Sequence, residues 1–230
     1  VTSDQVSGCA FPALQSEESS FCFLPILWNY GGSLAQIDSP AGRQAFGFLK
    51  QLAENKALSE DNVNMTISDI AWEFANGNIA MAFLTSGYEN EIREENPDLH
   101  FATTKLPCGE NSITISGGEV LTVTCAEHEK EAREFLDQPE QTEVYLDSMG
   151  YLAARRDLLK KQIQTDPAKK TYWSYLKQAK FREIEPYWPS LSMEVAESIN
   201  RVILGEDTQD ELEQLSERIS RIRRAKYEKE

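Results

Sequence analysis

Residues 66–84, TISDIAWEFANGNIAMAFL, constrain the fold more than any other stretch of this chain. Thr66 and Asp69 have the spacing of a helix capping box, and the Asn-Gly pair at 76–77 is typical of a helix end. The alternating apolar residues at 79–84 follow at once and indicate a short β-strand. A helix that leads directly into a strand is typical of α/β proteins. We therefore expect an α/β fold.

Further helix and strand signals lie on both sides of this stretch. Ser39 is placed as an N-cap, with Pro40 in the first helical position, and the spacing predicts a helix over 40–55. Two β-branched runs surround a Gly-Gly pair within 112–125, and they predict further strands.

The last third of the chain is predicted to be mostly helical. Gly205 stands where a glycine ends a helix, and Thr208 with Glu211 has the spacing of another capping box. The apolar positions of the final helix are spaced to form a buried stripe: Leu212, Leu215, Ile219 and Ile222. The helices expected after residue 125 span 127–136, 138–149, 166–181, 190–205 and 207–224.

Charge and hydropathy exclude two classes of protein. The formal net charge is −15, and such a field repels a phosphate backbone, so we expect no nucleic-acid partner. No apolar run approaches the roughly 20 residues that span a bilayer. The first residues lack the basic and apolar parts of an export signal, which is expected to be absent or already removed.

Signals for catalysis and for metal binding are scarce. Neither His100 nor His128 is followed by a histidine or cysteine three or four residues later, and no phosphate-binding loop, dinucleotide fingerprint or nucleophile elbow occurs. The many carboxylates leave open an acid/base pair of the glycosidase kind, because such a pair is defined in space. We expect no metal, no cofactor and no enzyme activity.

The four cysteines leave two states open. Cys9, Cys22, Cys108 and Cys125 show neither a Cys-x-x-Cys motif nor a histidine at zinc spacing. Two disulfides and buried free thiols fit this count about equally well, so the cysteines do not settle the compartment.

Aromatic residues beside glycines and prolines are the main sign of a ligand site. Trp28 and Tyr30 precede a Gly-Gly pair, Tyr88 follows a predicted strand, and Tyr187 and Trp188 stand between two prolines. Sugar rings stack their apolar faces on aromatic planes, while their hydroxyls seek carboxylates, amides and backbone groups. One such aromatic alone is more often a packing residue, but three groups in predicted loops favour a ligand site.

The order of these motifs resembles the extracellular solute-binding proteins of bacterial ABC importers, especially the carbohydrate-binding family that includes maltose-binding protein. The matching stretches run from about residue 21 to residue 222: FLPILWNYGGSL, SPAGRQAFGFLKQLAENKAL, WEFANGNIAMAFLTSGY, ISGGEVLTVT, the helix pair with the GYLAAR turn, and VILGEDTQDELEQLSERI. No single stretch is specific for this family, but the order and spacing of all the stretches together are specific.

The resemblance implies a set of ligand-binding residues: Trp28, Tyr30, Tyr88, Gly117, Gly118, Glu119, Arg155, Tyr187 and Trp188. Trp28, Tyr88 and Trp188 would line the cleft as stacking rings. The Gly-Gly-Glu sequence at 117–119 would lie at the rim, and Arg155 would reach a ligand hydroxyl. Many members have a tryptophan where this chain has Tyr88, so the ring is retained and a hydroxyl is added.

The resemblance also implies how the chain is divided. Residues 1–107 and 151–230 would form the C-terminal lobe of a periplasmic-binding-protein-like fold of class II, a mixed sheet flanked by helices with a helical C-terminal end. Residues 108–150 would be an excursion into an N-terminal lobe that this sequence lacks. We therefore expect a truncated domain, whose excursion packs on itself, on the lobe, or on another copy in a domain-swapped or edge-paired oligomer.

The function expected from the resemblance is a receptor that delivers a carbohydrate to the permease subunits of an ABC importer. It would act in the periplasm or outside the cell, free or as a lipoprotein, and would meet the membrane only through a lipid anchor or the permease. Three alternatives stay open: a binding protein for a polyamine or a glycerol phosphate ester, a glycosidase-type domain, and an interaction module whose aromatics form a protein interface.

Overall fold

The structure is a computed structural model that describes residues 6–107, 112–118, 120, 122–124 and 126–225. Ten α-helices are assigned in this part of the chain: α1 (Glu17–Asn29), α2 (Pro40–Glu54), α3 (Ile67–Ala75), α4 (Tyr88–Glu95), α5 (Glu129–Leu136), α6 (Pro139–Met149), α7 (Arg156–Thr165), α8 (Pro167–Leu176), α9 (Trp188–Ile203) and α10 (Thr208–Arg224). Short 3₁₀ turns lie at Leu34–Gln36, Glu60–Asn64 and Ala126–His128. No helix of this part is long and apolar enough to cross a membrane.

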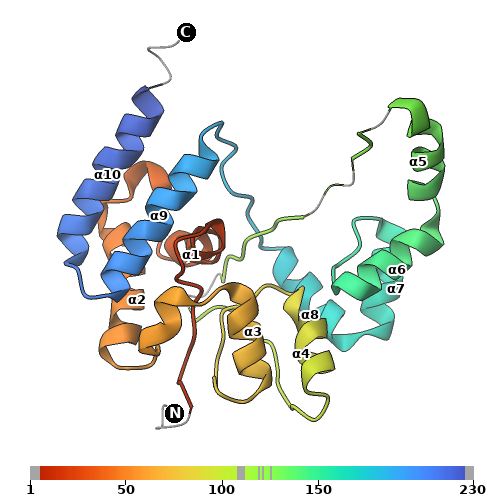
Figure 1. Cartoon of the computed structure of the whole chain (residues 1–230), viewed down its shortest axis with the longest axis horizontal. Helices are drawn as coiled ribbons and strands as arrows, with labels where there is room; N and C mark the ends of the chain where they lie inside the picture. Colours follow the sequence, from red (N-terminus) through yellow and green to blue (C-terminus); the bar gives the residue numbers. More distant parts are fainter. Residues whose placement is uncertain (1–5, 108–111, 119, 121, 125, 226–230) are drawn as a thin grey trace.

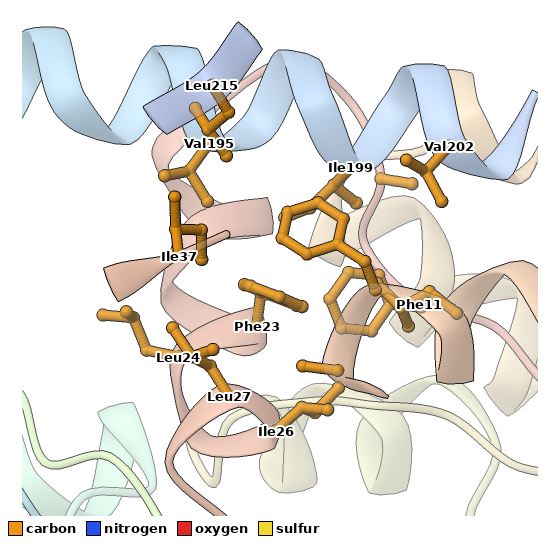
Figure 2. Packing of buried hydrophobic residues seen from close by; sticks show 14 of the residues in the cluster. Phe11, Phe23, Leu24, Ile26, Leu27, Ile37, Val195, Ile199, Val202 and Leu215 are labelled. Carbon is orange, nitrogen blue, oxygen red and sulfur yellow. The ribbon is translucent and has the colours of Figure 1, made fainter. Parts of the chain in front are cut away.

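The main core lies between helices from opposite ends of the sequence. Helices α1 and α2 pack against α9 and α10 (Figure 1), and their buried side chains interdigitate in Figure 2. The rings of Phe23 in α1 and Phe46 in α2 are fully buried, with their centroids 4.5 Å apart. Val195 and Ile199 of α9 close the same core. Burial of this apolar surface is the main force that joins the two ends.

Helix α1 was not predicted from the sequence. Its residues 23–27 are all buried, so it lacks the one-sided apolar pattern that identifies a surface helix. It also contains Pro25, which has no backbone N–H to donate to the carbonyl of Phe21 one turn earlier. Packing on α2 and α9 outweighs this local cost.

Most of the predicted helix ends are confirmed. Ser39 accepts a hydrogen bond from the Gly42 N–H at 3.3 Å, and the Thr66–Asp69 capping box makes both of its bonds. The glycines that follow three helices have left-handed backbones, with φ values of +79° at Gly77, +68° at Gly150 and +110° at Gly205.

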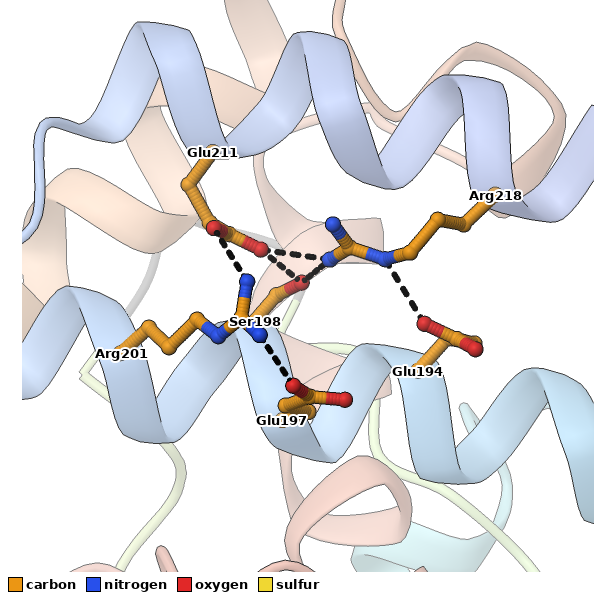
Figure 3. Close-up of polar contacts among 6 residues, drawn as sticks. All are labelled: Glu194, Glu197, Ser198, Arg201, Glu211 and Arg218. Atoms are coloured by element: carbon orange, nitrogen blue, oxygen red, sulfur yellow. Dashed lines mark hydrogen bonds and ion pairs between the residues drawn. The ribbon is translucent and has the colours of Figure 1, made fainter.

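The predicted capping box at the start of α10 is wrong. Asp207 is the N-cap, and its carboxylate accepts from the N–H groups of residues 209 and 210. Thr208 is already the first helical residue. Glu211 turns to α9 instead, where Ser198 donates to its carboxylate, and Arg218 of α10 itself binds the same carboxylate (Figure 3). A nearby acceptor on Asp207 leaves Glu211 available for this buried contact.

The mixed sheet is not confirmed. In the described residues, the β-bridges are three isolated parallel ones, Ser7–Ile79, Ala10–Ala82 and Ile115–Lys180. The predicted strand at 79–84 therefore pairs in the structure only with the segment around residues 7–10.

A buried side-chain amide takes the place of a further strand beside Phe11. Asn62 accepts from the Phe11 N–H at 3.0 Å and donates to the Phe11 carbonyl at 2.5 Å. Backbone groups that are hidden from water need such partners, and Asn62 supplies both.

Helices α5 to α8 gather at one end of the molecule, away from α1, α2, α9 and α10 (Figure 1). Within this group, Lys161 of α7 pairs with Glu143 of α6 at 2.8 Å. Helix α4 connects to the group, because Asn90 donates to the Asp147 carbonyl at 2.6 Å. Two extended segments, 113–118 and 180–187, lead from the group back to α1 and α9.

Candidate functional site

A stripe of partly or fully exposed side chains along α1 organises the candidate site. Glu17, Phe21 and Trp28 are spaced at four and seven residues, so they share one face of the helix. We call these three residues the α1 stripe. Its opposite face is buried in the main core. The segments 113–118 and 180–188 run beside the stripe and next to each other, because the Ile115–Lys180 bridge joins them.

Tyr88 lies beside the start of α1. Its hydroxyl is 3.1 Å from Ser68 Oγ on α3. Burial raises the pKa of the Tyr88 hydroxyl. The hydrogen bond to Ser68 lowers this pKa and the charge of Glu18 raises it, and the net shift is upward. Glu18 is itself held by the backbone N–H of Ile67, at 3.0 Å. Tyr88 is therefore a protonated hydrogen-bonding aromatic next to the α1 stripe.

Trp188 is the first residue of α9 and lies beside Glu17. Its side chain is 6% exposed, and its indole N–H donates to Glu17 Oε1 at 2.8 Å. The Arg182 guanidinium carbon lies 5.2 Å from the centroid of the ring and pairs with Glu17. The prediction that Trp188 stacks on a ligand stays untested, and in this structure the ring supports Glu17. Tyr187, beside it, is half-buried against the main core.

Trp28 and Tyr30 were predicted to lie in a loop, and this prediction is wrong. Trp28 belongs to the last turn of α1, and Tyr30 caps the helix. Lys180 Nζ lies 6.0 Å from the centroid of the Trp28 ring. The predicted loop was inferred from the Gly-Gly pair that follows, which in fact marks the end of the helix.

Asn29 fixes segment 113–118 against α1. Its side chain donates to the Ile113 carbonyl at 2.7 Å and accepts from the Ile113 N–H at 2.8 Å. The same segment then reaches Gly117, which lies against the ring of Phe21. A Cβ atom added to Gly117 would be 3.2 Å from Phe21 Cζ, so a larger residue here would require the Phe21 ring to shift by a few tenths of an ångström.

Phe21 is the residue that sequence reasoning missed. It lies at the centre of the α1 stripe, under Gly117, and only recognition of α1 as a helix would have placed it in register with Trp28. Gly118 is exposed with open space around it. The predicted rim residue Glu119 lies outside the described residues.

Arg155 is not brought to the α1 stripe. It caps the start of α7, in the group formed by α5 to α8, and it pairs with Asp157 at 2.8 Å. The hydrogen bond to Asp157 and the charge of that carboxylate raise the pKa of Arg155.

A shallow hollow lies at the C-terminal end of α10, away from α1 and α7 (Figure 1). It is lined by Ser216, Glu217, Ser220, Arg221, Arg224 and Ala225. It contains no aromatic ring, so we place the candidate site on α1.

The described cysteines are free thiols and are poorly suited to catalysis. Burial raises the pKa of Cys9 to about 11 and that of Cys22 to about 12, so both stay protonated at neutral pH. Cys108 and Cys125 lie outside the described residues. Among the residues that the structure describes, no three His, Cys, Asp or Glu side chains are placed to hold a metal ion.

The solved structures that resemble this chain are periplasmic-binding-protein-like. The maltose-bound structure of T. maritima MalE3 superposes with a TM-score of 0.82 at 18% identity and covers 94% of this chain and 60% of its own length. An ABC transporter solute-binding protein from Thermotoga lettingae, bound with α-D-tagatose, gives 0.83 at 20% identity, over 95% and 60%. These identities establish the fold alone.

The profile of the bacterial extracellular solute-binding proteins matches residues 2–171, and the chain belongs to this family. Binding proteins of Brucella abortus and Brucella suis are 20% identical over 206 residues, which is 84% of this chain and 50% of the relative. The chain thus spans about half the length of the curated relatives that it matches. Members of such a family bind solutes and are not enzymes, and its description places them outside the cytoplasm.

Proposed function

We propose that this chain is the sugar-binding lobe of a receptor that delivers a carbohydrate to an ABC importer. The observation that carries the proposal is the α1 stripe, in which the rings of Phe21 and Trp28 share one helix face with the carboxylate of Glu17. Flat apolar rings beside fixed polar groups suit a pyranose, which has apolar faces and a rim of hydroxyls. The sugar ligands of the T. lettingae and T. maritima proteins support the same class.

Tyr88 adds a second wall to the proposed site. Tyr88 is the first residue of α4; its ring packs against α3, and its hydroxyl is already oriented by Ser68. In the proposal, Phe21 and Tyr88 stack on the sugar, while Gly117 and Gly118 let it approach the backbone. The roles predicted for Arg155 and Glu119 are kept as proposals for the complete protein, in which a second lobe closes on the ligand.

The division of the chain belongs to the same proposal. Residues 1–107 and 151–230 would form the lobe that carries the α1 stripe, and 108–150 the excursion toward the other lobe. Support comes from the position of α5 and α6, which lie apart from the main core (Figure 1). The mixed sheet, the permease subunits as partners, lipoprotein anchoring and a swapped or edge-paired oligomer are proposals of the same kind.

A thermal-shift experiment tests the sugar-binding proposal. Maltose and tagatose at millimolar concentration should raise the melting temperature of the chain, because a ligand that binds only the native state stabilises it. Phe21→Ala and Tyr88→Ala should each abolish most of this shift. Phe135→Ala is the matched control, since Phe135 is an exposed aromatic on α5 and its loss should leave the shift intact.

Two results would contradict this proposal. A shift that Phe21→Ala and Tyr88→Ala leave unchanged would place the sugar elsewhere. A shift with spermidine or glycerol 3-phosphate, and none with a panel of mono- and oligosaccharides, would favour one of the alternative solutes.

A further inference from the structure

Glu17 and Arg182 form an ion pair at the end of the α1 stripe that is only partly covered. The side chains are 46% and 43% exposed, respectively, so each keeps groups that face water. Glu17 Oε1 accepts hydrogen bonds from both the guanidinium of Arg182 and the indole N–H of Trp188. The pair is thus fixed in orientation by a buried ring, which is unusual for a surface ion pair.

Four charged groups next to the stripe balance one another, while Glu183 and Glu185 of segment 180–188 pair with Arg223 of α10. Glu17 is paired with Arg182, and Lys180 lies over the Trp28 ring on the same side of α1. Glu18 accepts from a backbone N–H at the start of α3. These four groups comprise two anions and two cations, whereas the whole chain carries −15. Glu91 of α4 adds a more distant negative charge near Tyr88.

From this geometry we infer that the Glu17–Arg182 pair selects an uncharged ligand with two adjacent hydroxyls. One hydroxyl oxygen accepts from the Arg182 guanidinium while its neighbour donates to the Glu17 carboxylate, so both charges keep partners. An ammonium ligand would compete with Arg182 for Glu17, and a phosphate would compete with Glu17 for Arg182. Either competitor would leave one protein charge without its partner, which disfavours both.

The inference rests on the proposed sugar-binding function and names the groups that give it specificity. It also decides between the solutes that the sequence left open. A polyamine and a glycerol phosphate ester are both rejected by a charge-balanced pair, although the acidic chain as a whole attracts polyamines over longer distances.

Isothermal titration calorimetry on the full chain tests this assignment with maltose, tagatose, spermidine and glycerol 3-phosphate. Glu17→Gln and Arg182→Gln should each weaken sugar binding by roughly ten-fold or more, because each removes a charge-assisted hydrogen bond. Glu17→Gln keeps an oxygen that can accept from Trp188, so the ring should stay in place. Arg182→Glu should weaken sugar binding and strengthen spermidine binding, since it creates two adjacent carboxylates.

The controls come from an ion pair of the same type on another helix. Glu129 and Arg133 pair at 2.7 Å on α5, with exposed fractions of 51% and 69%. Glu129→Gln and Arg133→Gln should leave every affinity unchanged. Circular dichroism and the melting temperature check that the variants at residues 17 and 182 are folded. Should Glu17→Gln fail to fold, the partly exposed Arg182 variants give the same readout.

The outcomes separate this inference from the proposed function. Sugar binding that is equal in the wild type and in all three variants at residues 17 and 182 overturns the inference and leaves the proposed function standing. Unchanged spermidine binding in Arg182→Glu also counts against the inference. A wild-type chain that binds no sugar overturns the proposed function, and the inference with it.

Discussion

A buried carboxylate holds the last two helices together. Glu211 of α10 is 3% exposed, and it accepts from Ser198 Oγ at 2.7 Å and from Arg218 at 2.5 Å (Figure 3). Arg201 lies 3.4 Å from its other oxygen. A carboxylate at this depth is tolerated only when it is paired and hydrogen-bonded, and α9 supplies most of its partners.

Loss of this carboxylate should destabilise the chain. Glu211→Ala should lower the free energy of unfolding by about 1.5 to 3 kcal/mol, because hydrogen bonds to a charged group are lost. Arg218 keeps its contact with Glu194 at 2.7 Å, which limits the damage. Urea denaturation measures the change. Glu217→Gln, at an exposed position of the same helix, is the control and should alter stability by less than about 0.5 kcal/mol.

The same carboxylate predicts how stability depends on pH. Burial acts to raise the pKa of Glu211, but hydrogen bonds from Ser198 and Arg218 and the charges of Arg218 and Arg201 outweigh it, so its pKa is lowered below 4.5. A group with a lowered folded-state pKa stabilises the fold above its unfolded pKa and loses that effect as pH falls through the folded value. Unfolding titrations between pH 7 and 3 should therefore show a loss below about pH 4.5 that Glu211→Gln reduces.

Helices were predictable where their signals are local, and pairing between distant segments was not. The ends of α2 and α3 follow from Ser39 and from the Thr66–Asp69 box, which act within one turn. Helix α1 was not predicted because it is buried on most sides. Without this helix, the position of Phe21 in the site could not be predicted either. The bridges at Ile79 and Ala82 depend on residues 7–10, which the local pattern of 79–84 does not specify.

The candidate site was predictable in part for the same reason. The aromatic residues were identified by their type and by the glycines and prolines beside them. Their grouping depends on the tertiary fold. Trp188 contacts Glu17, and Gly117 contacts Phe21, although both pairs are far apart in the sequence. Arg155 had the right chemistry, but the structure places it on another group of helices.

Two glycines within α2 should respond to substitution in opposite ways. A Cβ atom at Gly42 would lie 1.7 Å from the Ile37 carbonyl oxygen, so Gly42→Ala must displace the backbone. This substitution should lower the free energy of unfolding by about 1 to 3 kcal/mol. Nothing lies within 4 Å of a Cβ at Gly47, so Gly47→Ala should stabilise the helix by about 0.5 to 1 kcal/mol. Urea denaturation of both variants checks this, and a shared sign would contradict the packing described for α2.

The molecule combines a well-buried group of helices with a more exposed one. Helices α1, α2, α9 and α10 share one apolar core, whereas no described residue of α5 is buried. Local stability follows the density of buried contacts, so the two groups should open with different free energies. This uneven distribution fits an excursion that is completed by other protein surface.

Hydrogen exchange with mass spectrometry should reveal this difference directly. Amides of α9 should be protected nearly to the level of global unfolding, and those of α5 should exchange much faster. If copies of the chain pair through the excursion, the protection of α5 and α6 should rise with protein concentration while that of α9 stays constant. Uniform protection across the chain at low concentration would contradict the picture of two groups.

The core that joins α1 and α2 to α9 and α10 has a consequence for how the chain is made. Residues 9–63 leave the ribosome before α9 and α10 are synthesised, so their apolar side chains stay without these partners in the meantime. Asn200 reaches back to the Ala13 carbonyl at 3.0 Å, and Ser20 donates to the Ser192 carbonyl. Closing such long loops costs chain entropy and slows folding. The shared core therefore forms only after α9 and α10 have emerged, and until then the apolar side chains of α1 and α2 are open to other contacts, such as those with chaperones.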